Sequence, residues 1–234
     1  MQEIQDPEIE TEIMARLRAK YASKRRKPSV DGIHLTTLIY CITQPFWYDK
    51  MDFIPTDQEV LYWAVGLGLE EVLLQDEAAS NRPAPRVIDG IVISPDYLML
   101  LGGALAELKT SRLRMSKEGY PTYGWSETWK AQMKGYSYGY GMLDYRLAVL
   151  QVAQARIYGW RFSFESKELD EFWAQMCWRR DRLLEALGRG LPPEPFAYCA
   201  EWECKRCPAL ILCEATKNAG AYVPKPITTT GGQS

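Results

Sequence analysis

The strongest constraint on this 234-residue chain is a group of three cysteines near its C-terminal end. The stretch CKRCPALILC places Cys204, Cys207 and Cys213 within ten residues. Cysteine thiolates at such short spacing are typical ligands of a zinc ion or of an iron–sulfur cluster, and either group takes four ligands. The chain must therefore fold so that a fourth cysteine reaches this segment.

Two other cysteines are candidates for the fourth ligand. Cys199 would complete a compact four-cysteine zinc site within the C-terminal segment. Cys41, in LTTLIYCITQPFW, would instead close a long loop and tie the two ends of the chain together. Cys177 falls in the middle of a predicted helix, and we expect it to be a packed thiol.

Composition and charge are those of an ordinary soluble globular protein, with 47% hydrophobic and 25% charged residues. No apolar run is long enough for a membrane span, and the charged N-terminus is unlike a signal peptide. We therefore expect a cytoplasmic protein with no membrane contact, whose cysteines are metal ligands or buried thiols rather than disulfides. The net charge is −2, but residues 16–27 are strongly basic; they could contact phosphates or form a solvated helix face.

The hydrophobic pattern predicts a small central sheet flanked by helices, in an α/β or α+β fold. A first helix should end before Pro28, with apolar residues at four-residue spacing (Ile9, Ile13, Leu17 and Tyr21). Thr56 and Glu59 form a capping box for a second helix, which is apolar nearly all round and should be buried. VIDGIVIS predicts a strand, LMLLGGALAELKTS predicts one or two more, and residues 126–145 and 169–190 predict helices.

A carboxylate and a lysine stand two residues apart in the apolar run ALAELK. Alternate residues of a strand share a face, so Glu107 and Lys109 should project together. If the strand of Asp89 pairs with this strand as a hairpin, two carboxylates converge and could bind Mg²⁺ or Mn²⁺. The lysine could then stabilise charge on a phosphate. The alternative is an ordinary ion pair with no catalytic part.

Gln132 and Tyr136 lie one helical turn apart and share a face of the predicted helix. They could clamp a nucleotide or its phosphate. Equally, this aromatic helix could simply pack on the core.

Taken together, these motifs resemble the iron–sulfur branch of the RecB-like nucleases, which have the PD-(D/E)XK fold. The resemblance rests on five motifs, which occur in the family's order over about residues 30 to 215. They are an early cysteine, an aspartate (Asp89), E-x-K, Q-x-x-x-Y and C-x-x-C-x-x-x-x-x-C. The CRISPR-associated RecB-like exonucleases match best, and the AddB nuclease domain shares the cysteine layout.

The resemblance implies roles for single residues. Cys41 would join Cys204, Cys207 and Cys213 around a [4Fe-4S] cluster, which closes the C-terminal module. Asp89 and Glu107 would bind the catalytic Mn²⁺ or Mg²⁺, Lys109 would be the catalytic lysine, and Gln132 and Tyr136 the family's fourth motif.

One position departs from the family pattern. The family supplies a histidine ligand four residues after a glycine on a buried helix. In GLGLEE the matching residue is Glu70, whose oxygens also suit Mg²⁺ or Mn²⁺. Glu71 is the second candidate, and His34 does not match the motif.

The expected function is metal-dependent exonuclease action on single-stranded DNA ends, with metal-activated water as the nucleophile. The resemblance implies trimming of DNA for CRISPR spacer acquisition, beside integrase proteins. Recombination or repair in a virus or mobile element is one alternative, and a catalytically impaired iron–sulfur DNA-binding adaptor is another. The expected division is a nuclease core over 1–190, a cluster segment over 191–216 and a disordered tail over 217–234.

Overall fold

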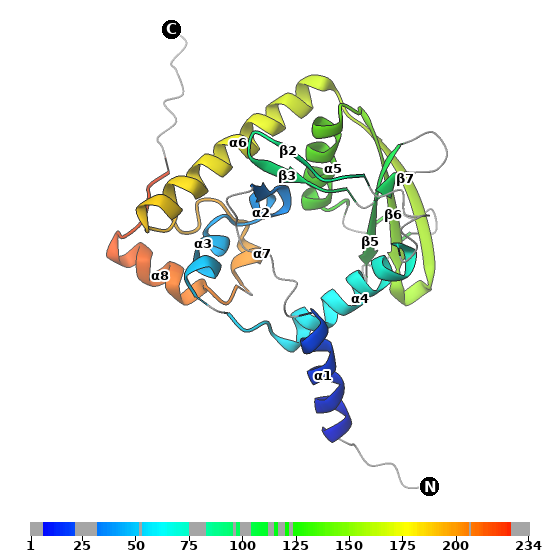
Figure 1. The fold of residues 1–234 in the computed structure, drawn as a ribbon, viewed down its shortest axis with the longest axis horizontal. Coiled ribbons are helices and arrows are strands. Elements are labelled where there is room, and N and C mark those ends of the chain that lie inside the picture. Colours follow the sequence, from blue (N-terminus) through cyan, green and yellow to red (C-terminus); the bar gives the residue numbers. More distant parts are fainter. Residues whose placement is uncertain are drawn as a thin grey trace. The chain divides into compact units, whose positions relative to one another are not determined.

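The computed structural model describes residues 7–21, 32–51, 53–74, 83–95, 97–98, 104–111, 115–116, 120–121, 124–205 and 207–225 (Figure 1). The chain divides into two compact units that do not follow chain order. The first comprises Met1–Arg26, Phe53–Arg86 and Ser94–Ser166, and the second comprises Lys27–Asp52, Val87–Ile93 and Lys167–Ser234. The segment that carries Cys41 and the C-terminal cysteine segment thus belong to the same unit.

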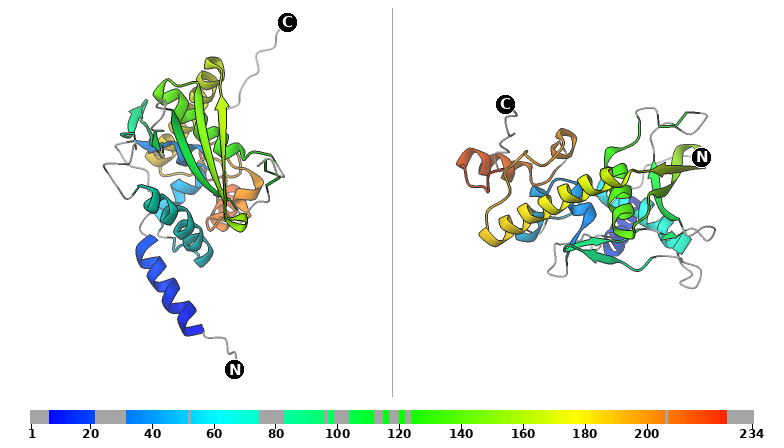
Figure 2. Two further views of the ribbon diagram at one scale, coloured as in Figure 1. Left: turned by 90° about the vertical axis from the view of Figure 1, so that its right-hand side faces the viewer. Right: turned by 90° about the horizontal axis from the view of Figure 1, so that it is seen from above.

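The first unit is built on a four-stranded mixed sheet. Its strands are β4 (Tyr97–Leu98), β5 (Leu105–Ser111), β6 (Asp144–Gln151) and β7 (Arg156–Ser163), in the order β4-β5-β6-β7. The three long strands run side by side (Figure 2, left). β5 and β6 are parallel, and the other two pairs are antiparallel. β6 buries alternate residues, Tyr145, Leu147 and Val149, because side chains alternate between the faces of a strand.

Helices pack against this sheet. α4 (Asp57–Leu74) contacts β5, and α5 (Glu127–Tyr140) contacts β6. The short helix η2 (Val152–Gln154) links β6 to β7. α5 ends at Gly141, whose φ of 67° is the left-handed conformation that glycine adopts without strain at a helix end. α1 (Pro7–Tyr21) packs against α4.

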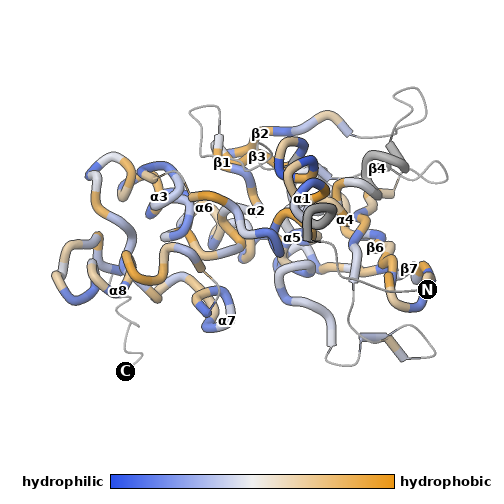
Figure 3. The backbone as a smooth tube through the Cα atoms, turned by 90° about the horizontal axis from the view of Figure 1, so that it is seen from below, coloured by the Kyte–Doolittle hydropathy of each residue, from blue (hydrophilic) through white to orange (hydrophobic). Residues whose placement is uncertain are grey.

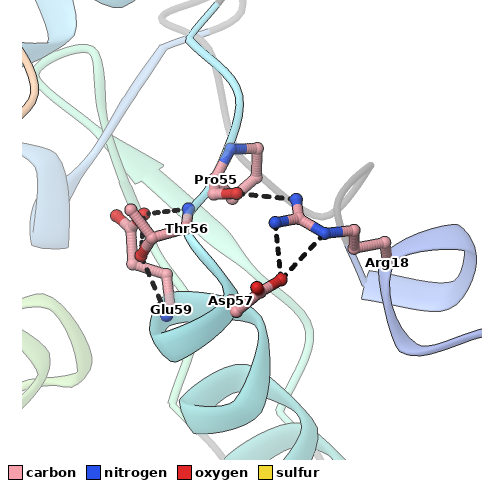
Figure 4. Close-up of polar contacts among 5 residues, drawn as sticks. All are labelled: Arg18, Pro55, Thr56, Asp57 and Glu59. Atoms are coloured by element: carbon pink, nitrogen blue, oxygen red, sulfur yellow. Dashed lines mark hydrogen bonds and ion pairs between the residues drawn. The ribbon is translucent and has the colours of Figure 1, made fainter. Parts of the chain in front are cut away.

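The capping box predicted at the start of α4 is confirmed (Figure 4). Glu59 Oε2 accepts the backbone N–H of Thr56 at 2.8 Å, and Thr56 Oγ1 accepts the backbone N–H of Glu59 at 3.2 Å. Arg18 of α1 binds the same helix start, with Asp57 Oδ1 at 2.6 Å and the carbonyl of Pro55 at 2.7 Å. One residue of the basic segment therefore joins α1 to α4.

The expectation that α4 is buried all round is wrong. Leu61, Tyr62 and Val65 have 42%, 42% and 39% of their surface exposed, whereas Val60 is fully buried. An apolar sequence cannot say which face of a helix has a neighbour, because that depends on what packs against it.

The second unit contains a small three-stranded sheet and five helices among its described residues. The strands are β1 (Ile33–His34), β2 (Arg86–Ile88, its first residue assigned to the first unit) and β3 (Ile91–Ile93), in the order β1-β3-β2. The helices are α2 (Leu35–Ile39), α3 (Thr43–Lys50), α6 (Ser166–Arg189), α7 (Glu201–Cys204) and α8 (Leu210–Ala219). α3, from early in the chain, lies beside α7 and α8 (Figure 1), and residues of all three helices line one cavity.

α6 is the long helix of the second unit. Its buried residues, Leu169, Trp173, Met176, Leu183 and Ala186, recur at three-, four- and seven-residue spacing, which places them on one face. The tube of α6 accordingly changes between hydrophobic and hydrophilic colours along its length (Figure 3). The helix ends at Gly190, as predicted, where φ is 64°.

The run VIDGIVIS is a hairpin rather than one strand. Asp89 and Gly90 form a two-residue turn between β2 and β3, with φ values of 49° and 72°. Asp-Gly favours this turn because both central residues need positive φ. β2 therefore pairs with β3, and β5 pairs with β4 and β6, so the expected hairpin between the strands of Asp89 and Glu107 is wrong.

The C-terminal end of the described chain is ordered against the segment after α6. The segment predicted as a tail begins inside α8, and Val223 pairs with Pro193, with its N–H bonded to the carbonyl of Pro192 at 2.8 Å. Residues 226–234 lie outside the described residues. In the part of the chain that is described, no helix combines the length and apolarity needed to cross a membrane.

Candidate active site and cysteine site

Glu107 is a buried carboxylate at the middle of β5, with 1% of its surface exposed. Lys109 projects from the same face of the strand, and its Nζ lies 2.5 Å from Glu107 Oε1. The predicted sharing of a face is therefore confirmed. A carboxylate held away from water is costly unless charge and hydrogen bonds compensate it, and the lysine supplies the charge.

A helix and a neighbouring strand supply the remaining partners of this carboxylate. Gln132 Nε2 donates to Glu107 Oε1 at 2.5 Å and lies 3.0 Å from the hydroxyl of Tyr136. The hydroxyl of Tyr145 donates to Glu107 Oε2 at 3.3 Å. The structure thus brings together four of the predicted site residues, Glu107, Lys109, Gln132 and Tyr136.

Tyr145 is a partner that the sequence analysis did not find. It lies on β6, two positions from the direct neighbour of Glu107 in the parallel register and on the same face of the sheet. No local motif marks it, because its role depends on the pairing of β5 with β6.

This arrangement has a chemical consequence. The described partners use three acceptor positions of a carboxylate that offers about four. These contacts hold both oxygens of Glu107 in one orientation. A fixed carboxylate beside an ammonium group is suited to binding a cation and stabilising a nearby negative charge.

Asp89 belongs to the second unit, whereas Glu107 belongs to the first. Its Oδ2 accepts a hydrogen bond from Trp173 Nε1 at 2.9 Å, and the Cys177 thiol lies 3.9 Å from the same oxygen. Arg180 donates to the backbone carbonyl of Asp89. α6 thus binds both the carboxylate and the backbone of Asp89 in this turn. Burial raises the pKa of the neighbouring Cys177 thiol.

The side chains of Glu70 and Glu71 lie outside the described residues, although both residues belong to α4. Their predicted part in metal binding therefore stays a prediction.

Five cysteines line one cavity of the second unit: Cys41, Cys199, Cys204, Cys207 and Cys213. They come from the segment between α2 and α3, the turn before α7, the end of α7, the segment between α7 and α8, and α8 itself. Both candidates for the fourth ligand are therefore present. Cys177 is not among the described residues that line this cavity.

The cysteine side chains contact one another and a neighbouring amide. Cys199 Sγ lies 3.1 Å from Cys204 Sγ, and Gln44 Nε2 donates to Cys207 Sγ at 3.6 Å. Within the described residues, no three Cys, His, Asp or Glu side chains converge so as to hold a single metal ion. A four-iron cluster takes one thiolate per iron, and so uses ligands arranged around a cavity.

The thiols of the cavity differ in their acidity. A hydrogen bond from Cys199 lowers the pKa of Cys41 to about 7 and raises the pKa of Cys199 itself. Burial raises the pKa of Cys207, and it raises the pKa of Cys213 to about 12. A metal group that binds here must displace protons from several sulfurs.

Comparison with known proteins gives a fold likeness. No protein-family model and no curated protein sequence matches the chain. Among solved structures, SSO0001 is similar over 88% of this chain and 96% of its own, with a TM-score of 0.55 and 21% identity. A second similar structure is LHK-Exo, an alkaline exonuclease from Laribacter hongkongensis, with a TM-score of 0.45 and 11% identity. The similarity covers 68% of this chain and 91% of LHK-Exo. The structure of LHK-Exo in complex with dAMP gives the same values.

The likeness to SSO0001 extends over nearly the whole of both chains and shows a shared fold. The sheets and helices described above confirm the prediction of an α/β protein with small mixed sheets flanked by helices.

Proposed function

We propose that this chain is a metal-dependent DNA exonuclease with a PD-(D/E)XK core. The observation that carries the proposal is the buried Glu107, paired with Lys109 on one strand face and held by Gln132 from α5. The E-x-K and Q-x-x-x-Y motifs, 25 residues apart in sequence, meet at one carboxylate. Core packing alone does not require a lysine, a glutamine and a tyrosine to converge on a buried acid.

The residues of this site have separate parts in the hydrolysis of a phosphodiester. Glu107 holds a divalent cation, and Gln132 with Tyr145 keeps its carboxylate in place. The Lys109 ammonium stabilises the negative charge that develops on the phosphate oxygens, because such charge is poorly screened in a partly buried site. Tyr136 fixes the amide of Gln132.

The cation completes this chemistry. The sequence resemblance alone assigns Asp89, Glu107 and Glu70 to it, and oxygen ligands suit Mn²⁺ or Mg²⁺. A divalent ion bound there would lower the pKa of a water molecule and so make it a better nucleophile near neutral pH.

We assign a [4Fe-4S] cluster to the cysteine cavity, with Cys41, Cys204, Cys207 and Cys213 as ligands. Support comes from the five sulfurs around one cavity and from the Gln44 amide directed at Cys207. A cluster at this place would join the segment before α3 to the segment before α8. Its function is then architectural.

The proposed substrate and cellular process rest on the sequence resemblance alone. The substrate is single-stranded DNA ends, and the process is the trimming of DNA for CRISPR spacer acquisition beside integrase proteins.

A second candidate function is a DNA-binding adaptor without turnover. It is favoured by the ion pair of Glu107 and Lys109, which is complete without a metal. The exonuclease is expected to bind a divalent cation and to cleave DNA, whereas the adaptor is expected to bind DNA without cleaving it.

The test compares the wild type with Glu107→Gln, which keeps the shape of the side chain and removes its charge. Mn²⁺ binding is measured by calorimetry, and cleavage is measured on end-labelled single-stranded DNA with Mn²⁺ or Mg²⁺. The wild type should bind the ion and degrade the DNA, and Glu107→Gln should do neither. Glu171→Gln, which alters an exposed ion pair on α6, is the control. A wild type that binds DNA but never cleaves it is the adaptor.

A further inference from the structure

Arg179 of α6 joins the two segments that carry the cysteines. Its guanidinium donates to three backbone carbonyls, those of Leu38, Tyr40 and Tyr198, the latter two at 2.6 and 2.9 Å. Tyr40 directly precedes Cys41, and Tyr198 directly precedes Cys199. A single planar side chain therefore fixes the backbone on both sides of the cysteine cavity, which is a geometry that the rigid fork of arginine allows.

Glu203 makes a second bridge between the same segments. Its Oε1 accepts the backbone N–H of Cys41 at 3.0 Å, and its Oε2 accepts the backbone N–H of Ala200 at 2.6 Å. Glu203 directly precedes Cys204. The backbone groups at and beside Cys41 and Cys199 are thus bound by two side chains, one cationic and one anionic.

The charge of Arg179 is placed where the cysteine site needs it. Burial lowers the pKa of Arg179, while the nearby Cys41 and Glu203 raise it. Carbonyl oxygens accept hydrogen bonds from this guanidinium but carry no full negative charge, and Glu203 partly offsets its positive charge. Thiolates, or a cluster bound by four thiolates, would add further negative charge beside it.

We propose that Arg179 is the positioning residue of the cysteine site. Its guanidinium fixes the segments of Cys41 and Cys199 relative to one another before any group binds, and its charge stabilises the anionic bound state. The second part rests on the cluster proposed above, whereas the first part does not.

Two substitutions separate these contributions. Arg179→Lys keeps the charge and loses the planar fork, so it should fail to hold three carbonyls at once. Arg179→Gln loses the charge as well. Arg189→Gln is the matched control, because Arg189 lies on the same helix and forms only an exposed ion pair with Glu185 among the described contacts.

The first measurement follows the cluster in protein purified without oxygen. In both Arg179 variants the cluster should be lost to an iron chelator at least tenfold faster than in the wild type. In Arg179→Gln the ratio of reduced to oxidised cluster at a fixed potential should fall at least tenfold, which is about 59 mV for one electron. Arg179→Lys should keep this ratio within about threefold of the wild type, and Arg189→Gln should match the wild type in both respects. An unchanged cluster lifetime in Arg179→Gln would overturn the proposal, and an unchanged ratio would remove its second part.

The second measurement needs no cluster. In metal-free protein, the rates at which Cys41 and Cys199 react with a maleimide are measured by peptide mass spectrometry. Both rates should rise at least tenfold in Arg179→Lys and Arg179→Gln, because the segments are no longer held. A wild type without iron would end the cluster assignment and leave this measurement to decide the role of Arg179. Rates equal to those of Arg189→Gln would show that Arg179 does not position the cysteines.

Folding of the variants is checked by circular dichroism. If Arg179→Gln does not fold and Arg179→Lys does, that rescue supports the need for the charge. If neither variant folds, Arg179 is a core residue and the proposal fails.

Discussion

Gln132 Nε2 lies 2.5 Å from Glu107 Oε1, so a hydrogen bond joins α5 directly to the buried carboxylate of β5. The donor belongs to the Q-x-x-x-Y motif and the acceptor to the E-x-K motif. Because Glu107 is buried and Gln132 is half-buried, the hydrogen bond helps to fix the orientation of both side chains. This contact gives the helix a part in the site that an aromatic helix in a core would not have.

The first prediction concerns this contact. Gln132→Ala should weaken DNA cleavage by about tenfold or more, since Glu107 loses one of its three described partners. Metal content and melting temperature should stay close to those of the wild type. Tyr136→Phe removes only the hydroxyl and should have a smaller effect in the same direction. If Gln132→Ala is silent and Tyr136→Ala unfolds the protein, the helix serves only for packing.

The second prediction concerns Lys109. Lys109→Ala should still bind Mn²⁺ and DNA but should cleave about 10²–10³-fold more slowly, the loss typical of a group that stabilises transition-state charge. Cleavage of end-labelled DNA and calorimetry on the same sample check this. Lys167→Ala, which alters an exposed lysine of α6, is the control and should be fully active. Loss of Mn²⁺ binding in Lys109→Ala would show a structural role instead.

The third prediction distinguishes the two candidates for the fourth cysteine ligand. Protein purified without oxygen should be brown and hold about four irons per chain. Cys41→Ser should lose iron and folded protein together, while Cys199→Ser and Cys177→Ser should keep both. Iron analysis and circular dichroism measure these outcomes. Iron loss in Cys199→Ser alone would reverse the assignment, and one zinc per chain in a colourless protein would refute the cluster.

The fourth prediction addresses the position at which the family supplies a histidine. Glu70→Ala should lose Mn²⁺ binding and cleavage, as Asp89→Ala should, and Glu70→His should retain activity because imidazole can also bind Mn²⁺. Glu71→Ala is the matched control on the same helix turn. Full activity in Glu70→Ala together with an inactive Glu71→Ala would move the ligand by one residue.

The fifth prediction concerns stability. Thr56→Ala removes the side-chain oxygen that accepts the N–H of Glu59, and it should lower the free energy of unfolding by about 1 kcal/mol. Thr56→Ser keeps that oxygen and should lie within about 0.5 kcal/mol of the wild type. Urea unfolding measures both variants. Equal losses in the two would mean that the cap contributes nothing.

Local sequence determined the features that depend only on neighbouring residues. The capping box at Thr56, the end of α6 at Gly190 and the shared face of Glu107 and Lys109 were all predictable. Each follows from a backbone period or from a hydrogen bond between residues close in the chain. The Asp-Gly pair at 89–90 is an equally local turn signal, and the interpretation of VIDGIVIS as one strand did not take it into account.

Only the tertiary structure decided which segments meet. The parallel pairing of β5 with β6 brings Tyr145 to Glu107, and the position of α6 brings Trp173 to Asp89 and Arg179 to the carbonyls beside Cys41 and Cys199. These contacts join residues 19 to 139 positions apart. Strand pairing and helix packing are selected by the burial of apolar surface over the whole chain, and no local pattern encodes that choice.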